Sequence, residues 1–153
     1  MSAALTVRAA GPDDLAHVLA LLDEDAIREV AEDRTDLAPY AAALAEIAAS
    51  GHAAVLVGEL GGAIVATAQV SWLRRLMYRG SLVCQVESVR VASASRGHGI
   101  DTAMMRWIVD DARARGCARV ELTSNAARVE ARRFYERLGF LPTHVGFKLY
   151  LGG

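Results

Sequence analysis

The residues best suited to chemistry lie together in one stretch of the sequence, from Leu82 to Thr102. Its second part, Arg96 to Thr102, is a turn that contains two glycines and leads into an amphipathic helix. Such a turn stacks backbone N–H groups at a helix start, where the helix dipole favours a phosphate group. Glu87, in the apolar first part, is a carboxylate close in sequence to this turn. The stretch therefore predicts a phosphate-binding turn.

The apolar residues before this turn change parity along the chain. They take even positions before Glu87 and odd positions after Ser88: Leu82, Cys84 and Val86, then Val89 and Val91. One face of the strand can stay apolar only if an extra residue is inserted between the two sets. This predicts a β-bulge near Glu87 and Ser88. A bulge leaves backbone N–H and C=O groups free to bind something other than a neighbouring strand.

These residues resemble the acyl-CoA-binding core of the GNAT superfamily of N-acetyltransferases. The pattern V-x-V-x-x-x-x-R-x-x-G-x begins at Val89 and leads to Asp101. In the family, the signature Arg/Gln-x-x-Gly-x-Gly/Ala holds the CoA pyrophosphate with its backbone amides. Arg96 and Gly99 match this signature, whereas Asp101 stands where the last Gly or Ala is expected. The resemblance implies that the turn binds acetyl-CoA.

The resemblance also implies a set of residues that contact acetyl-CoA. The bulged strand is expected to hold the thioester carbonyl and pantetheine, unless ordinary strand pairing occupies its backbone. Asn125 is expected to replace a pantetheine-binding asparagine of the family, and Arg128 to meet the 3′-phosphate. The expected contacts are Val89, Arg90, Val91, Arg96, Gly97, His98, Gly99, Ile100, Asp101, Thr102, Asn125 and Arg128. No metal is implied.

Asp101 allows two arrangements with different consequences. If its carboxylate faced the pyrophosphate at about 5 Å, repulsion at an effective dielectric near 20 would be roughly 3 kcal/mol, about two decades in affinity. Alternatively, the side chain points outward while the Asp101 N–H still serves the phosphate. We expect the outward arrangement, because Asp is a favourable residue in the first turn of a helix.

Two residues are candidates for catalysis by this resemblance. Glu87 lies where many GNAT enzymes carry a carboxylate that takes a proton from the amine, directly or through water. We expect Val86 and Val89 to enclose it and strengthen it as a base. The alternative is a carboxylate on the open face that attracts a cationic substrate. Tyr135, in ARRFYERLGF, matches the family's A-x-x-x-Y-x-x-x-G-F, where the hydroxyl protonates the CoA sulfur, although it could be a core aromatic.

The rest of the chain supplies the elements that position these residues. We expect one α/β domain over residues 1–153, with a central, mostly antiparallel sheet of about seven strands flanked by four helices, in the order β-α-α-β-β-β-α-β-α-β-β. Residues 23–36 are expected to connect the first two helices. The expected strands are 5–9, 53–60, 63–73, 82–91, 119–123 and two short strands within 140–151; the expected helices are 13–22, 39–51, 99–116 and one that ends before Gly139.

Composition narrows the classes of function. The chain has 153 residues, is 53% hydrophobic and has a net charge of −1, so nothing favours nucleic acid or an anionic membrane as a partner. The two cysteines lack the spacing of a metal site or a disulfide framework. The sequence has no export signal and no long apolar run, so we expect a cytoplasmic protein. The sequence is compatible with either a monomer or a homodimer.

We therefore expect an N-acetyltransferase that moves an acetyl group from acetyl-CoA to a primary amine of a small molecule, by direct transfer in a ternary complex. One alternative is a degenerate GNAT-fold protein that binds CoA, or nothing, without catalysis, which Asp101 makes reasonable. A second alternative is a dinucleotide-binding unit around Gly97 and Gly99. That alternative is weaker, because the third glycine of its motif is missing and the chain has too few βαβ units.

Overall fold

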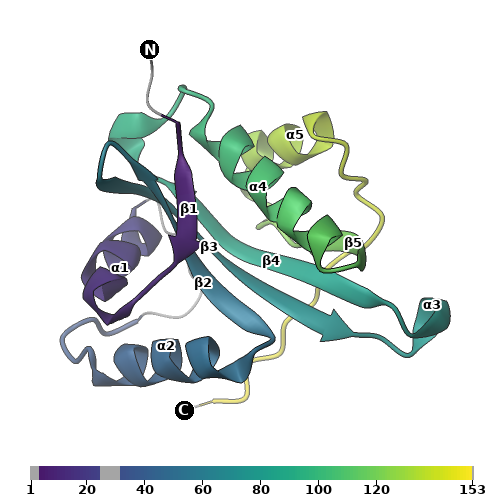
Figure 1. Ribbon diagram of the computed structural model, residues 1–153, viewed down its shortest axis with the longest axis horizontal. Helices are drawn as coiled ribbons and strands as arrows, with labels where there is room; N and C mark the ends of the chain where they lie inside the picture. Colours follow the sequence, from purple (N-terminus) through teal and green to yellow (C-terminus); the bar gives the residue numbers. More distant parts are fainter. Residues whose placement is uncertain (1–3, 25–31, 153) are drawn as a thin grey trace. The chain divides into compact units, whose positions relative to one another are not determined.

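The computed structural model describes residues 4–24 and 32–152 (Figure 1). Residues 25–31, which belong to the expected connection between the first two helices, lie outside the described residues. The chain divides into two compact units, Met1–Leu122 and Thr123–Gly153, and we describe each by itself. No helix in the described ranges is long and apolar enough to cross a membrane.

The first unit is built around one open sheet. Its strands lie in chain order, β1-β2-β3-β4-β5; the first four are antiparallel neighbours, and β5 is parallel to β4. The prediction of a mixed α/β fold with a mostly antiparallel sheet is therefore confirmed. The elements are β1 (Thr6–Ala9), a 3₁₀ turn (Pro12–Asp14), α1 (Leu15–Asp23), α2 (Ala38–Ser50), β2 (Ala53–Leu60), β3 (Ala63–Arg74), α3 (Met77–Gly80), β4 (Leu82–Val91), a second 3₁₀ turn (Ser93–Ser95), α4 (Ile100–Ala114) and β5 (Cys117–Leu122).

Helices cover both faces of this sheet. Val57 of β2 belongs to a buried cluster with Val18 of α1 and Leu44 of α2. The next residue, Gly58, lies on the opposite face of the sheet, since successive residues of a strand alternate faces. A Cβ at Gly58 would lie 3.4 Å from the sulfur of Met104 in α4. Helices α1 and α2 therefore cover one face, and α4 covers the opposite face (Figure 1).

The number of strands differs from the prediction. The structure has five strands in its described residues rather than about seven, because residues 140–151 form no strand. The alternation of Val145, Phe147 and Leu149 is a local strand signal, but these side chains are exposed. A strand needs a partner in matching register, which the alternation alone does not supply, and Pro142 lacks an N–H for strand pairing.

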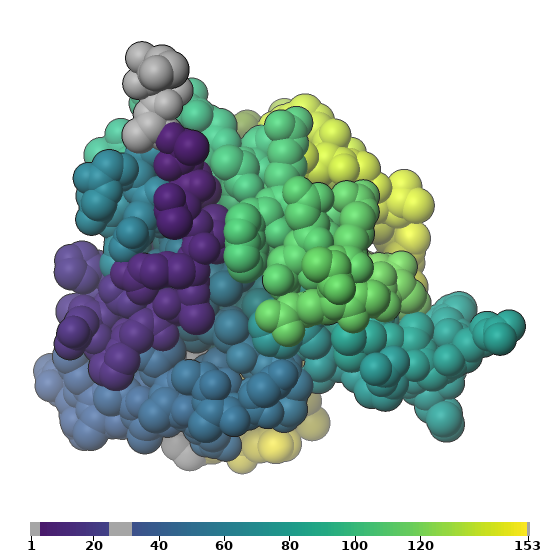
Figure 2. Space-filling model, in the orientation of Figure 1, coloured from purple at the N-terminus to yellow at the C-terminus, as the bar shows by residue number. Residues whose placement is uncertain are grey.

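The number of helices also differs, because α3 adds a fifth helix to the four that were predicted. It occupies four residues of the β3–β4 connection, too few for a periodic signal. Tyr78 (φ 54°) and Arg79 (φ 64°) are left-handed, so α3 is a tight turn rather than a regular helix. In Figure 2 this turn projects from the rest of the first unit, and Leu76 and Met77 are among its exposed side chains.

The second unit contains one regular element, α5 (Val129–Arg137). Gly139, just beyond its end, has φ 100°, which is typical of the glycine that ends a helix. Tyr135 packs between Phe134 and Phe140, with ring centroids 5.1 Å and 5.9 Å away. The predicted last helix is therefore confirmed, and its aromatic residues form a local cluster.

An ion-pair network joins β1 to the turn before α1 and to β2. Arg8 donates to both carboxylate oxygens of Asp14, at 2.7 and 3.0 Å, and to Oε1 of Glu59 at 2.7 Å. Asp14 also accepts a hydrogen bond from the backbone N–H of Gly11 at 2.7 Å. The hydrogen bonds from Arg8, and then from Gly11, lower the pKa of Asp14 to about 2.

We predict that Asp14 stabilises the fold at neutral pH through this network and that its contribution is lost in acid. Asp14→Asn should lower the free energy of unfolding by about 1 kcal/mol at pH 7. Because the pKa of Asp14 falls from its usual 3.8 to about 2 on folding, this contribution is complete above about pH 4 and is lost as the pH falls toward 2. Urea denaturation at pH 7 and pH 2.5 should show the gap between the two proteins closing. Asp13→Asn, at an exposed neighbour, is the control, and a gap that stays constant would contradict the prediction.

Candidate functional site

The predicted bulge is present in β4. Thr67 of β3 pairs with Arg90, and Gln69 pairs with Glu87, so Ala68 alone stands opposite the two residues between them. The first of these two, Ser88, has a left-handed backbone with φ 55°. A non-glycine residue in this region is uncommon, and such residues persist where the surrounding structure holds them. The prediction of an interrupted ladder near Glu87 and Ser88 is confirmed.

The bulge coincides with the end of the pairing between β4 and β5. The last pair is Val86 with Leu122, and in the described residues β4 continues beyond it paired only with β3. Backbone groups of Val89 to Val91 therefore lie along an edge that no strand covers. One of them is already used, because the Arg90 guanidinium donates to the carbonyl oxygen of Val89 at 2.9 Å. The pairing of β4 with the next strand ends where β5 ends, at Leu122, and the predicted divergence of the two strands stays a prediction.

The turn before α4 is formed by two left-handed glycines. Gly97 has φ 80° and Gly99 has φ 73°, and a Cβ at either position would have no heavy atom within 4 Å. The open space above both glycines leaves room for a ligand close to the backbone. Helix α4 begins at Ile100, whose side chain is buried, so the helix N-terminus is fixed against the sheet. This geometry fits an anion held by backbone N–H groups.

His98 contributes to the turn through one nitrogen of its ring. Its Nδ1 lies 3.2 Å from the carbonyl oxygen of Ser95 and 3.0 Å from that of Arg96. Carbonyl oxygens only accept hydrogen bonds, so Nδ1 is the donor in both contacts. The imidazole therefore stabilises the turn through Nδ1, and Nε2 and the backbone N–H of His98 are the groups left for the predicted phosphate contact.

Glu24, at the end of α1, also contacts the start of the turn. Its Oε2 accepts a hydrogen bond from the backbone N–H of Ser93 at 2.8 Å and lies 3.9 Å from Nη2 of Arg96. Sequence reasoning missed this residue, because Glu24 stands in an acidic run without a motif. The contact spans 69 residues, so no local pattern could have predicted it.

Asp101 does not take the outward arrangement that we expected. Its Oδ1 accepts a hydrogen bond from the backbone N–H of Thr102 at 2.8 Å, and the residue is half-buried. The helix dipole favours a carboxylate in this place, just as it favours a phosphate. Asp101 therefore uses one of the N–H groups that were predicted to bind the CoA pyrophosphate, and it brings a negative charge to the same helix end.

Glu87 is exposed, so the expectation that apolar neighbours enclose it is wrong. Val86 points to the face covered by α4, because adjacent strand residues alternate, and Val89 lies beyond the bulge. Glu87 shares its face with Gln69, the residue opposite it in β3. The carboxylate is therefore open to solvent and accessible to a substrate amine, on the side of the sheet that α1 and α2 cover.

The remaining predicted site residues belong to the second unit. Asn125 uses its side-chain oxygen to accept a hydrogen bond from the N–H of Ala127 at 2.9 Å. Arg128 is half-buried immediately before α5, and Tyr135 lies in the aromatic cluster described above. The first unit thus brings Glu87, the bulge and the turn together, whereas the roles of these three residues stay predictions.

This chain matches one protein family, a curated relative and several solved structures. Residues 17–140 match the family described as Acetyltransferase (GNAT) family. Glucosamine 6-phosphate N-acetyltransferase 1 of Oryza sativa subsp. japonica is 32% identical over 130 residues, which cover 84% of this chain and 70% of the relative. The crystal structure of a transcriptional regulator from Bacillus halodurans C-125 is 34% identical, with a TM-score of 0.85 over 96% of this chain and 99% of that one. A predicted acetyltransferase of Clostridium acetobutylicum, solved with acetyl-CoA, is 20% identical with a TM-score of 0.73 over 96% of each chain, which shows the fold alone.

We predict that Gly99→Val weakens CoA binding at least tenfold. The new side chain would occupy the open space above the turn, where the structure leaves room for the ligand. The left-handed backbone also makes the substitution destabilising, by about 1 to 2 kcal/mol. Gly51→Val is a matched control, because Gly51 has φ 76° and equally open surroundings but lies at the end of α2. Calorimetric titration with CoA should show the loss only in Gly99→Val; equal affinities would place the site elsewhere.

We predict that Asp101→Asn tightens CoA binding. The substitution keeps the size of the side chain and an acceptor for the Thr102 N–H, and it removes the charge. Relief of a repulsion of up to roughly 3 kcal/mol corresponds to a gain of ten- to a hundredfold in affinity. Asp110→Asn, at an exposed position later in α4, should leave the affinity unchanged. Titration at low and high salt is the measurement, and an unchanged Kd for Asp101→Asn would mean that the carboxylate does not oppose the phosphate.

Proposed function

This chain belongs to the GNAT family of acetyltransferases, and on that premise we propose that it transfers an acetyl group from acetyl-CoA to a primary amine of a small molecule. We propose direct transfer in a ternary complex. The observation that carries the proposal is the bulge at Ser88, because it interrupts the β3–β4 ladder beside an exposed carboxylate, just before a glycine turn at a helix start.

The described residues fit acetyl-CoA in their geometry. Helix α4 offers N–H groups at its start, the two glycines leave open space, and β4 has an uncovered edge. Backbone of the turn would hold the pyrophosphate, and Val89 to Val91 would hold the pantetheine and the thioester carbonyl. When bound, acetyl-CoA supplies the activated acetyl group and a thiolate leaving group. The negative charges of Asp101 and Glu24 repel the phosphates of acetyl-CoA. This repulsion lowers the affinity for acetyl-CoA but does not block its entry to the site.

Glu87 is our candidate general base. An amine must lose its proton to act as a nucleophile, and a positioned carboxylate typically contributes a factor of 10² to 10⁴ to the rate. The exposure of Glu87 lets the carboxylate reach the amine directly or through one water, and it also lets the negative charge attract an ammonium ion. The structure is thus compatible with both roles that the sequence left open for this residue.

Tyr135 is our candidate general acid. The family pattern around it motivates this role, and its ring is held by Phe134 and Phe140. A tyrosine hydroxyl that protonates a departing thiolate acts mainly in the transition state. Its ring packing can survive the loss of the hydroxyl, so packing and chemistry can be separated by substitution.

The proposal is tested by titration with acetyl-CoA followed by a thiol-release assay against a panel of amines. The panel includes glucosamine 6-phosphate, because the relative from rice is named for it. Burial raises the pKa of Cys84 to about 11, which keeps this thiol protonated and limits background in the assay. Turnover with any primary amine supports the proposal. Tight binding without turnover would favour the degenerate CoA-binding alternative instead.

We predict that Tyr135→Phe lowers kcat and kcat/KM together, by roughly 10² to 10⁴, with little change in the Kd for acetyl-CoA. Tyr150→Phe, in the same unit, is the control and should behave like the natural protein. Steady-state kinetics beside a titration with acetyl-CoA is the measurement. A purely structural tyrosine would instead keep kcat and change only stability, by about 1 kcal/mol. An unchanged kcat would remove Tyr135 from the mechanism.

A further inference from the structure

Two adjoining hollows lie between helices α1 and α2 and the sheet. Their volumes are about 120 Å³ and about 60 Å³. Both are lined by Val18 and Leu22 of α1 and by Val55 and Gln69 of the sheet, which is why we treat them together as the α1–α2 cavity. All of its lining residues belong to the first unit.

The α1–α2 cavity lies beside the candidate base. Ser88, the left-handed residue of the bulge, lines the smaller hollow. Gln69 lines both hollows and stands directly opposite Glu87 in the β3–β4 register. Residues opposite each other in an antiparallel pair point to the same face, with Cβ atoms about 4.5 to 5.5 Å apart. A group held in the cavity would therefore lie next to the Glu87 carboxylate.

The lining of the cavity is apolar, and two of its few polar groups already have partners. The hydroxyl of Tyr40 donates to the carbonyl oxygen of Asp33 at 3.0 Å. The hydroxyl of Thr67 donates to the carbonyl oxygen of Leu56 at 2.8 Å. The Gln69 amide is the other polar group of the larger hollow. Such a surface favours a hydrocarbon group over a polar one.

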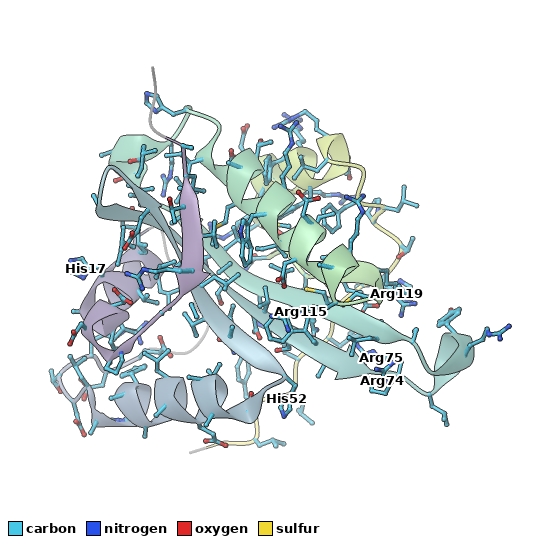
Figure 3. The ribbon with its side chains drawn as sticks, viewed as in Figure 1. His17, His52, Arg74, Arg75, Arg115 and Arg119 are labelled. Carbon is cyan, nitrogen blue, oxygen red and sulfur yellow. The ribbon has the colours of Figure 1, made fainter. Side chains whose placement is uncertain are left out.

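No arginine or lysine among the described residues lines either hollow. Figure 3 shows four labelled arginines toward the end of the sheet that carries α3, away from α1: Arg74, Arg75, Arg115 and Arg119. Three of them pair with carboxylates, Arg75 and Arg119 with Glu121, and Arg115 with Asp111. Arg34 lies nearer, with its guanidinium 4.6 Å from the centre of the Tyr40 ring, but it already pairs with Asp23 at 3.2 Å and Glu32 at 2.8 Å. A phosphate in the α1–α2 cavity would therefore lose its water without gaining a cation from the lining residues, which is strongly unfavourable.

We propose that the α1–α2 cavity binds an apolar group of the acceptor, such as a phenyl ring or a branched alkyl chain of four or five carbons. An engineered apolar cavity of about 150 Å³ binds benzene, so the volume suffices for a group of this size. The acceptor is then a primary amine whose nitrogen lies one to three carbons from the apolar group, within reach of Glu87. This inference rests on the proposed function and names its substrate class.

The first test compares kcat/KM for 2-phenylethylamine, ethanolamine and glucosamine 6-phosphate at saturating acetyl-CoA. We expect 2-phenylethylamine to be preferred by at least ten- to a hundredfold, since even one methylene in an apolar pocket changes kcat/KM by that order. A preference for glucosamine 6-phosphate, or similar values for all three amines, would overturn the inference and leave the acetyltransferase function standing.

The second test fills the cavity by substitution. Ala43 of α2 lines the larger hollow and is itself exposed, so Ala43→Leu should extend into the hollow without disturbing the helix. Ala42→Leu, at the neighbouring exposed position that does not line the hollow, is the control. We expect Ala43→Leu to lower kcat/KM for 2-phenylethylamine at least tenfold and to leave the ethanolamine reaction and the Kd for acetyl-CoA unchanged. An equal loss for both amines would overturn the inference.

Measuring binding separately from turnover distinguishes the cavity assignment from the proposed acetyltransferase activity. Calorimetric titration of 2-phenylethylamine should show binding to the natural protein and to Ala42→Leu, and at least tenfold weaker binding to Ala43→Leu. If this pattern is found but no amine is acetylated, the cavity assignment stands and the proposed activity fails. If 2-phenylethylamine binds all three proteins equally, or binds none of them, the cavity does not hold an acceptor and the inference is wrong.

Discussion

The left-handed backbone of Ser88 is the constraint on which the candidate site depends. One such residue costs about 1 to 2 kcal/mol, and the pairing of β3 with β4 on both sides of it holds it in place. The extra residue returns Val91 to the face that α4 covers and leaves Glu87 on the face of α1 and α2. It also lies next to the last pair between β4 and β5, Val86 with Leu122. The exposed Glu87 carboxylate, the last β4–β5 pair and the Ser88 side of the smaller hollow all lie at this change of register.

The negative charges of Asp101 and Glu24 oppose the binding of an anion, which the geometry of the turn favours. The glycines and the start of α4 form a place for an anion, yet Asp101 and Glu24 already accept hydrogen bonds from N–H groups of this region. A carboxylate at a helix start and a phosphate at the same place are favoured by the same dipole, so they compete. On our proposal, the affinity for acetyl-CoA therefore depends on how far these two carboxylates can move aside or be neutralised by Arg96, and not on the backbone alone.

Local patterns predicted the parts of the fold and site that depend on local physics. The parity change before Val89 predicted the bulge, and the glycines at 97 and 99 predicted the turn. The exposure of Glu87 and the contact of Glu24 could not be predicted, because each depends on packing between distant segments. The hydrogen bond from the Thr102 N–H to Asp101 is local, but the residue type alone allowed two side-chain arrangements. The tail was predicted as strands from its alternation, which carries no information about a pairing partner. The α1–α2 cavity likewise depends on how helices meet the sheet.

The most direct test of the account is a titration of the isotope-labelled protein with acetyl-CoA. The titration is monitored through the backbone amide resonances in NMR spectra. The account predicts that the largest changes fall on the amides of residues 89–91 and 97–102, with smaller changes along the rest of the sheet. Changes concentrated elsewhere, with these amides unaffected at saturation, would contradict the claim that the bulge and the turn form the acetyl-CoA site.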